Sequence, residues 1–438
     1  MRRAHRGGGA VAAAAVAALL LFGGCAGRSG SAGAAGGAGS AGGELPPPVR
    51  EVLPNGLRLI VQEHRAADIV AVYLYVGVGV RYERPDQLGY SHFQEHMLFK
   101  GTDKWGPGYI DRTVEGVGGR TNATTSFDFT DFYIMAPTES LETAMQTLAD
   151  MVFRSTFDPN EVAREREVIF EEANIETDNP YGYPVLGTRP TMSAATSAIL
   201  KAYNKHYYTP ENMVLVVAGP VDAKAVRAMV DRIWGVIPAT GYKPVQAPVP
   251  HRQTGIARKS VERPEQQARL AMGWLGPPTN DFSGDAVDLL TTILAGAESS
   301  RLAIRLRDKE RLVSSITMNY SAQMGGGIVS LRAELEAKDL ARVEQIVLEE
   351  IARMQADGPT EEERQLAVIR AESQHAFDTE TADGLANAYA IAETTWTLDA
   401  ELGYVDRLGK ITREQIRDAA RRYLSLTNYA RISFQPKP

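Results

Sequence analysis

Two patterns of hydrophobic residues alternate along residues 49–240, and each predicts a different kind of secondary-structure element. Short apolar, β-branched runs that follow turn signals such as Asn55-Gly56 indicate strands. Apolar residues that recur every three or four positions, as between Leu141 and Met151, indicate helices. The expected strands are 57–61, 69–80 (a central strand), 120–127, 131–136 and 213–218, and the expected helices are 87–99, 110–117, 138–153, 158–177, 194–207 and 223–236.

Residues 256–438 repeat this plan more faintly, after a linker at 241–255 that is rich in Pro, Gln and Thr. The helix expected at 283–295 takes the place of helix 87–99, and Asp339 is expected to cap the helix that follows it. The other expected elements are strands at 268–274 and 430–434 and helices at 339–356, 361–377 and 413–423. We therefore predict an α+β fold with two homologous domains of about 190 residues, at 49–240 and 256–438.

The first 48 residues are not expected to belong to this fold. A basic start precedes an apolar run at 10–22, which is too short to cross a bilayer but suits an export signal. Two glycines then precede Cys25, a pattern that resembles a bacterial lipobox. We predict that residues 1–24 are a signal peptide, that Cys25 carries a lipid, and that residues 25–48, rich in Gly, Ala and Ser, form a flexible tether. An ordinary cleaved signal with an incidental cysteine is the alternative.

Composition narrows the classes of function. The chain has 44% hydrophobic and 23% charged residues, which is ordinary for a soluble globular protein. Its formal net charge of −7 argues against general nucleic-acid binding, which usually needs a basic face. Cys25 is the only cysteine and lies outside the expected fold, so disulfides within the chain and a catalytic cysteine are both excluded.

Helix 87–99 carries the first candidate chemistry. His92 and His96 are four residues apart, so both imidazoles leave one helix face and can reach one metal ion. Glu95 lies near the same face, where a carboxylate can take a proton from a metal-activated water. The order His-x-x-Glu-His is a signature of one class of zinc peptidases. A surface helix with two histidines by chance is the alternative.

A zinc ion with one open position needs a third protein ligand. Helix 158–177 offers Glu161, Glu165, Glu167, Glu171, Glu172 and Glu176. Glu165 and Glu172 share a partly apolar face, where carboxylates need compensation by a cation or a donor. Spacing does not choose between them, and a solvated acidic helix fits most of the six.

Four ordered segments carry a resemblance to a known family. The stretch 89–102 (GYSHFQEHMLFKGT) is similar to the signature of the pitrilysin family of zinc metallopeptidases, which includes insulin-degrading enzyme and mitochondrial processing peptidase. Segments 165–172, 180–189 and 207–219 resemble further family motifs. The resemblance extends from about residue 49 to the C-terminus and is denser in the first half.

The resemblance implies a role for each matching residue. His92, His96 and Glu172 match the ligands of one Zn²⁺ per chain, and Glu95 matches the general base. Glu165 matches a glutamate that supports the ligands from behind.

Two further matches concern the substrate. Asn122 and Ala123 match a strand edge that binds the substrate backbone by β-augmentation. Arg307 matches the arginine of an Arg/Tyr pair that holds the substrate carbonyl, but Ser314 stands where the family has tyrosine, and Tyr320 lies six residues further on.

The function implied is a zinc endopeptidase that cleaves unfolded peptides or extended segments in the cell envelope. The missing tyrosine predicts a homologous partner subunit that supplies an Arg/Tyr pair. Because Ala26 rather than Asp follows Cys25, we expect a periplasmic protein anchored at the outer membrane by its lipid alone. The alternative is a non-catalytic, peptide-binding or scaffolding subunit of a heterodimer.

Overall fold

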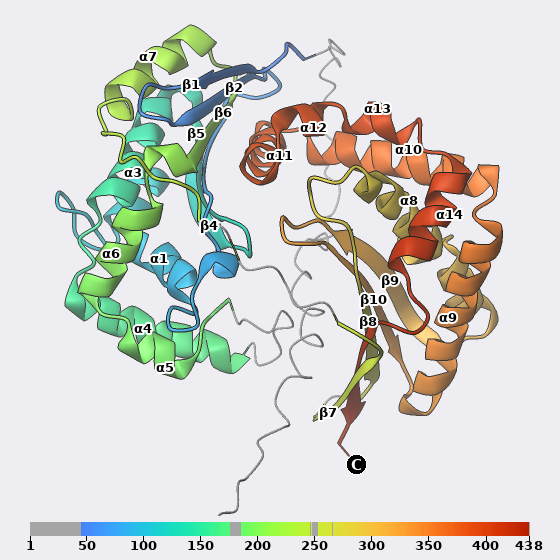
Figure 1. Ribbon diagram of the computed structural model, residues 1–438. Helices are drawn as coiled ribbons and strands as arrows, with labels where there is room; N and C mark the ends of the chain where they lie inside the picture. The colour runs from blue at the N-terminus through green and yellow to red at the C-terminus, as the bar shows by residue number, and fades with distance from the viewer. Residues whose placement is uncertain (1–44, 176–184, 246, 248–252, 265, 438) are drawn as a thin grey trace, which may run out of the picture.

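The computed structural model describes residues 45–175, 185–245, 247, 253–264 and 266–437. These residues form two layered α+β units, each built on one mixed sheet (Figure 1). The predicted α+β fold with two related units is therefore confirmed. Within the described residues, no helix is long and apolar enough to cross a membrane.

The first sheet has six strands in the order β1-β2-β6-β3-β5-β4. Their bounds are β1 Val49–Val52, β2 Arg58–Glu63, β3 Ile69–Val76, β4 Arg120–Thr125, β5 Thr130–Pro137 and β6 Met213–Gly219. Only β2 and β6 pair in parallel. The apolar run beginning at Ile69 lies between β6 and β5, as its composition predicted for a central strand, and β4 forms one open edge.

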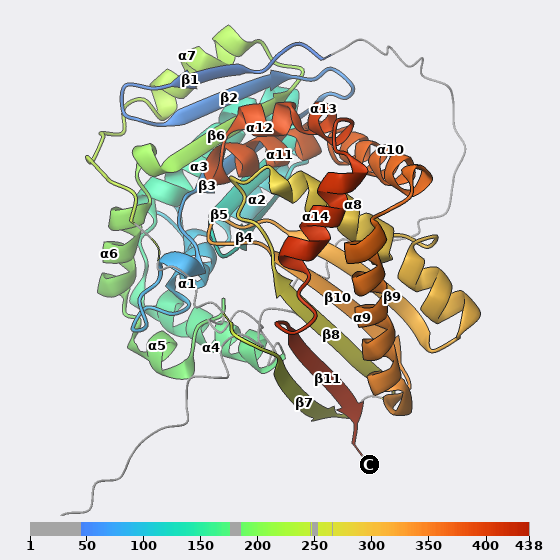
Figure 2. The ribbon, with the colours of Figure 1, turned by 45° about the vertical axis from the view of Figure 1, so that its right-hand side comes forward.

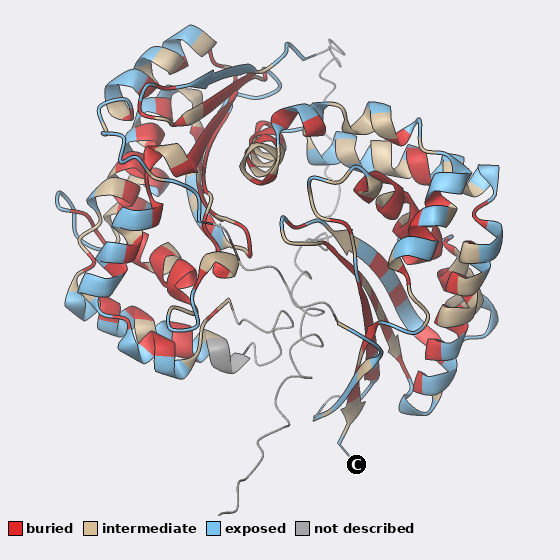
Figure 3. Cartoon of the chain, in the orientation of Figure 1, coloured by how far each residue is buried: buried red, intermediate tan, exposed pale blue. Residues whose placement is uncertain are grey.

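Helices cover one face of this sheet and enclose its main core (Figure 3). They are α1 Tyr90–Leu98, α2 Tyr109–Gly116, α3 Leu141–Arg154, α4 Pro159–Ile175, α5 Arg189–Ala194, α6 Ser197–Tyr207 and α7 Ala223–Ile233. The apolar stripe of α3 is buried as expected, with Met145, Leu148 and Met151 inaccessible to solvent. The carboxylate of Asp158 caps α4 by accepting from the backbone N–H of Asn160 at 2.8 Å.

The second sheet repeats the topology of the first. Its order, β7-β11-β8-β10-β9, corresponds strand for strand to β2-β6-β3-β5-β4, and its β11–β7 pair is also parallel. The strands are β7 Ala257–Arg263, β8 Ala268–Leu275, β9 Val313–Ser321, β10 Ile328–Leu335 and β11 Ala430–Pro436, and the helices on its covered face include α8 Ser283–Ala295, α9 Leu340–Asp357, α10 Glu361–Asp378 and α14 Arg413–Tyr423. Helix α8 occupies the position that α1 has in the first unit, as the sequence predicted.

One helix crosses from the second unit to the first. Helix α11 (Ala382–Thr395) packs on the second face of the first sheet, against β3 and β6 (Figures 1 and 2). Leu385, Ala386 and Tyr389 form a core there with Tyr73 and Val216. The Tyr73 hydroxyl donates to Asp383 at 2.8 Å. Both faces of the first sheet are therefore covered, one of them by the other half of the chain. Two short helices, α12 Leu398–Leu402 and α13 Tyr404–Leu408, lead back to the second unit.

Several boundaries differ from those predicted. The strand expected to reach residue 80 ends at Val76, where residues 77–82 turn towards α1. The helix expected at 194–207 begins at Ser197 instead, because the chain is extended at Ala195 and Thr196, and an additional short helix, α5, ends at Ala194. Asp339 makes no capping hydrogen bond, since a 3₁₀ turn precedes α9 there. The last residues of helix 158–177 and part of linker 241–255 lie outside the described residues.

Candidate metal centre

The beginning of α1 is fixed by a buried carboxylate and two glycines. Glu83 accepts from the backbone N–H of Gly89 at 2.7 Å and of Ser91 at 2.6 Å. These N–H groups have no partner within the helix, so Glu83 caps α1. Gly89 has a φ of 90°, and a Cβ there would lie 2.6 Å from the Cα of Gly187. Burial raises the pKa of Glu83 to about 7, although the hydrogen bonds from the backbone of Ser91 and Gly89 lower it.

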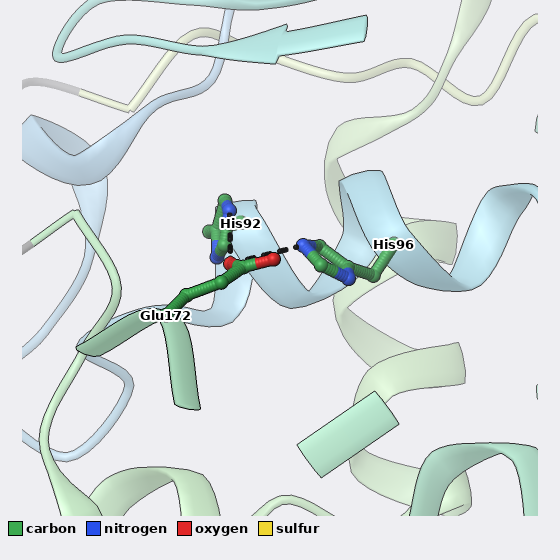
Figure 4. Close-up of side chains that lie close together, drawn as sticks. All are labelled: His92, His96 and Glu172. Carbon is green, nitrogen blue, oxygen red and sulfur yellow. Dashed lines mark ion pairs between the residues drawn. The ribbon is translucent and has the colours of Figure 1, made fainter. Parts of the chain in front are cut away.

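One turn later, α1 presents both histidines to Glu172 on α4 (Figure 4). The Glu172 Oε2 atom lies 3.7 Å from His92 Nε2 and 3.5 Å from His96 Nε2. The three ligand atoms all lie within 4.8 Å of one another. Of the six glutamates that the sequence left open, Glu172 is the one in this group.

The donor set of this group fits zinc. Two imidazole nitrogens and one carboxylate oxygen are a common zinc ligand set, and bonds of about 2.1 Å at tetrahedral angles place ligand atoms about 3.4 Å apart. The two nitrogen–oxygen distances match that spacing closely. Burial, and after it the charge of His96, lowers the pKa of His92 to about 3, so His92 is neutral at physiological pH. A neutral imidazole is the form that binds a metal ion.

The Glu95 side chain contacts the last residue of β4. The Thr125 hydroxyl donates to Glu95 Oε2 at 2.6 Å. Burial raises the pKa of Glu95, and the charge of Glu172 adds to this effect, while the Thr125 hydrogen bond and His96 oppose it. A carboxylate with a raised pKa is a better proton acceptor than an exposed one. Glu95 is therefore suited to proton transfer beside the three-residue group.

Glu165 lies behind His96, seven residues before Glu172 on α4. Its Oε2 atom is 3.0 Å from His96 Nδ1, and its Oε1 atom is 2.9 Å from Lys100 Nζ. Glu165 is only 6% exposed, so its carboxylate needs these two partners in place of water. A carboxylate on the far nitrogen of a ligand histidine fixes the orientation of the ring.

Asn122 and Ala123 lie on β4, the open edge of the first sheet. Their backbones pair with Tyr133 and Phe132 of β5, and within the described residues no strand pairs with the other side of β4. Thr125, which holds Glu95, ends the same strand. An edge strand therefore leads directly to the candidate base.

The residues that match the Arg/Tyr region have other partners. Arg307, on a π-helical turn at Ala303–Lys309, forms ion pairs with Glu298 and Asp308. The Ser314 hydroxyl donates to the backbone of Glu334 at 3.3 Å. The Tyr320 hydroxyl donates to the carbonyl of Pro277 at 2.9 Å, just after β8 ends, and the ring lies close to Gly276 and Gly327. None of these contacts links the three residues with the histidine group.

Sequence reasoning missed three residues that support the site: Glu83, Lys100 and Thr125. A carboxylate seven residues before the start of a helix resembles an ordinary loop residue, and no spacing rule assigns it as a cap. Lys100 directly follows the histidine motif, but its partner is set by the packing of α1 on α4. Thr125 is brought to Glu95 by the pairing of β4 with β5.

Comparisons with known proteins find matches for both halves of the chain. Residues 58–186 match the family model described as insulinase (peptidase family M16), and residues 194–370 match the one described as the peptidase M16 inactive domain. The chain is 30% identical to a zinc protease of Bacillus subtilis, over 70% of this chain and 79% of the relative. It is 32% identical to a zinc protease of Mycobacterium tuberculosis, over 72% and 76% of the two chains. Both relatives carry the description "uncharacterized".

Solved structures share the fold at low identity. A protease from Helicobacter pylori superposes with a TM-score of 0.83 at 21% identity, covering 90% of this chain and all of the other (100%). A peptidase M16 inactive-domain protein from Pseudomonas fluorescens superposes with a TM-score of 0.82 at 18% identity, covering 90% and 98% of the two chains. The first half of the periplasmic protease PqqL from Escherichia coli gives 0.74 at 21% identity, covering 89% and 92%.

Proposed function

Because this chain belongs to peptidase family M16, the insulinase family, we propose that it is a zinc-dependent endopeptidase that cleaves unfolded peptides or extended segments. The observation that carries the proposal is the meeting of His92, His96 and Glu172 beside Glu95. The names of its relatives as zinc proteases support the same metal and the same reaction.

The proposed mechanism divides the work between ligands and base. His92, His96 and Glu172 would hold one zinc ion, which supplies Lewis acidity to the scissile carbonyl and to the attacking water. Glu95 takes the proton of that water as it attacks, and then delivers the proton to the leaving amine. The hydrogen bond from Thr125 keeps one Glu95 oxygen occupied, so the other oxygen is the one available for this proton.

The open edge of β4 supports a preference for extended substrates. We propose that a peptide pairs with β4 at Asn122 and Ala123 as an added strand. Because β4 ends at Thr125, the added strand would lead its backbone past Glu95. The strands of a folded protein are already paired, so unfolded peptides or extended segments are the proposed substrate class.

The experiment that tests this function compares the wild type with Glu95→Gln. The wild-type chain should cleave an unfolded oligopeptide only when loaded with zinc. Glu95→Gln should keep the zinc and lose about 100-fold or more in kcat, because general acid–base catalysis contributes about that much. Full activity in Glu95→Gln would refute the role of the base.

We also propose a partner subunit that completes the site. Ser314 is too short to replace a tyrosine, and both Arg307 and Tyr320 are engaged elsewhere. A homologous subunit without the histidine motif but with an Arg/Tyr pair would supply the missing oxyanion contacts. Peptidase activity should then be low for the isolated chain and rise when such a co-encoded subunit is added. High activity of the chain alone, not increased by the partner, would contradict this proposal.

For location, we propose export to the periplasm and attachment to the outer membrane through a lipid on Cys25. Support comes from the basic and apolar start of the chain and from Ala26 after the cysteine. The residues concerned lie outside those that the structure describes. Mass spectrometry of the mature N-terminus should find a lipidated Cys25. An unmodified N-terminus downstream of it would refute the anchor.

A further inference from the structure

A lysine outside the ligand set is linked to His96 through a buried carboxylate. Lys100 Nζ lies 2.9 Å from Glu165 Oε1, and Glu165 Oε2 lies 3.0 Å from His96 Nδ1. Lys100 is one helical turn beyond His96, just after α1 ends at Leu98. His96 on α1 and Lys100 just after it therefore hold the two oxygens of a carboxylate that comes from α4.

Because Glu165 is buried, its carboxylate needs a partner such as Lys100 in place of water. The Glu165 side chain is 8% exposed, and its only side-chain partners among the described residues are Lys100 and the His96 ring. A buried carboxylate without a cation or a donor on each oxygen is costly and turns towards any available donor. With Lys100 on one oxygen, the other oxygen is held against the far nitrogen of His96.

The backbone of Lys100 is itself well fixed. Its N–H donates to the carbonyl of Met97 at 3.1 Å, and the next residue, Gly101, has a φ of 104°. A Cβ at Gly101 would lie 2.9 Å from the carbonyl oxygen of Trp105. The chain therefore turns at once after Lys100, whose Nζ contacts Glu165 on α4.

We infer that Lys100 is a positioning residue for zinc: it holds the Glu165 carboxylate, which in turn fixes the ring of His96. The inference rests on the proposed function, because His96 needs a fixed ring only if it binds a metal. Outer partners of this kind contribute about 10- to 100-fold to metal affinity. Lys100 acts one step further away than Glu165, so we expect the lower end of that range.

The chain offers a matched control for this residue. Lys104 lies in the same loop, and its Nζ is 3.0 Å from an Asp150 oxygen, so it also forms a carboxylate ion pair. Both lysines line one surface hollow of about 740 Å³. The Lys100 side chain is 31% exposed and that of Lys104 is 45% exposed, so replacement of either leaves no closed cavity. Only Lys100 contacts Glu165.

The test is the dissociation constant for zinc, measured by chelator competition on purified full-length chains. Lys100→Met should bind zinc about tenfold more weakly than the wild type, and Lys100→Gln, whose amide can still donate a neutral hydrogen bond, should lose less. Lys100→Arg should restore most of the affinity, because a guanidinium keeps the ion pair. Lys104→Met should match the wild type. Thermal unfolding of the metal-free proteins checks that each variant is folded.

A double-mutant cycle separates positioning from a general structural effect. In a Glu165→Gln background, Lys100→Met should cost less than twofold in zinc affinity, because the contact it serves is already lost. Equal affinities of Lys100→Met, Lys100→Gln and Lys104→Met would overturn the inference, and so would fully additive losses in the cycle. A wild-type chain that binds no zinc would refute the proposed function itself, which is a different and separately visible result.

Discussion

Asp288 on α8 is a carboxyl group whose ionisation the fold opposes. Removal from water raises its pKa to about 7, and the charge of Asp285 adds to this effect, while a hydrogen bond from the Tyr404 hydroxyl at 3.1 Å opposes it. Between its ordinary pKa of 3.8 and about 7, the folded chain holds a proton that the unfolded chain has released. This group therefore lowers the free energy of unfolding by about 1.4 kcal/mol for each pH unit of rise in that window.

Replacing Asp288 tests this pH dependence of stability. In Asp288→Asn the new side chain cannot ionise, yet its amide oxygen can still accept the hydrogen bond from the Tyr404 hydroxyl. The variant's free energy of unfolding should increase relative to the wild type as the pH rises from about 5 to about 7, and the difference should level off above about 7. Denaturant unfolding of both chains at several pH values measures the difference. A difference that does not change with pH would contradict the raised pKa.

The residues of the candidate metal centre were predictable to different degrees. His92, Glu95 and His96 follow from spacing on one helix, because i and i+4 positions share a face. Glu172 did not follow from spacing, since Glu165 lies on the same face of α4. The structure distinguishes the two by their contacts. Glu172 lies near the Nε2 atoms of both histidines, while Glu165 contacts Nδ1 of His96 on the opposite side of the ring.

At the scale of elements, α1 depends on a cap that the sequence did not reveal. Glu83 satisfies two N–H groups at its start, immediately before His92. Glu83→Gln would place an amide NH₂ against one of these donors. We expect a loss of about 1–3 kcal/mol in the free energy of unfolding, together with weaker zinc binding, because α1 carries two of the ligands.

The measurement is denaturant unfolding at about pH 8, where the Glu83 carboxyl group is charged. Asp86→Asn is the control, since Asp86 lies in the same loop and, among the described residues, forms an ion pair with Arg84 alone, at the surface. Its effect should stay within about 0.5 kcal/mol. Equal stabilities of the two variants would show that Glu83 does not support α1.

Local patterns predicted the elements whose partners are near in sequence. The apolar stripe of α3 and the Asp158 cap of α4 act within one helix, so they are visible in the chain. Helix α11 was not predicted. Its Leu385, Ala386 and Tyr389 face strands more than 150 residues away, and nothing in its own composition indicates that partner.

At the scale of the whole molecule, the two halves repeat one topology but are not independent. The second face of the first sheet carries Ile60, Tyr73, Tyr75, Val214 and Val216, and α11 covers it. The Tyr75 hydroxyl also contacts Asn387 at 2.5 Å. Without α11, this apolar face would meet water and act as a site of association.

The corresponding prediction concerns the separated halves. Residues 45–245 produced alone should aggregate or associate, and their coproduction with residues 253–437 should restore a soluble complex. Size-exclusion chromatography of each half and of the mixture is the measurement. A monodisperse, folded first half on its own would show that the α11 contact is dispensable.

The central claim is that His92, His96 and Glu172 together hold zinc, and the zinc content of purified chains tests it most directly. Glu171 is the neighbour of Glu172 on α4 and is exposed, so it provides a matched control. Zinc per chain, measured by atomic spectroscopy after dialysis, should be near one for the wild type and for Glu171→Gln, and near zero for Glu172→Gln and His96→Ala. Stoichiometric zinc in Glu172→Gln and His96→Ala would contradict the account.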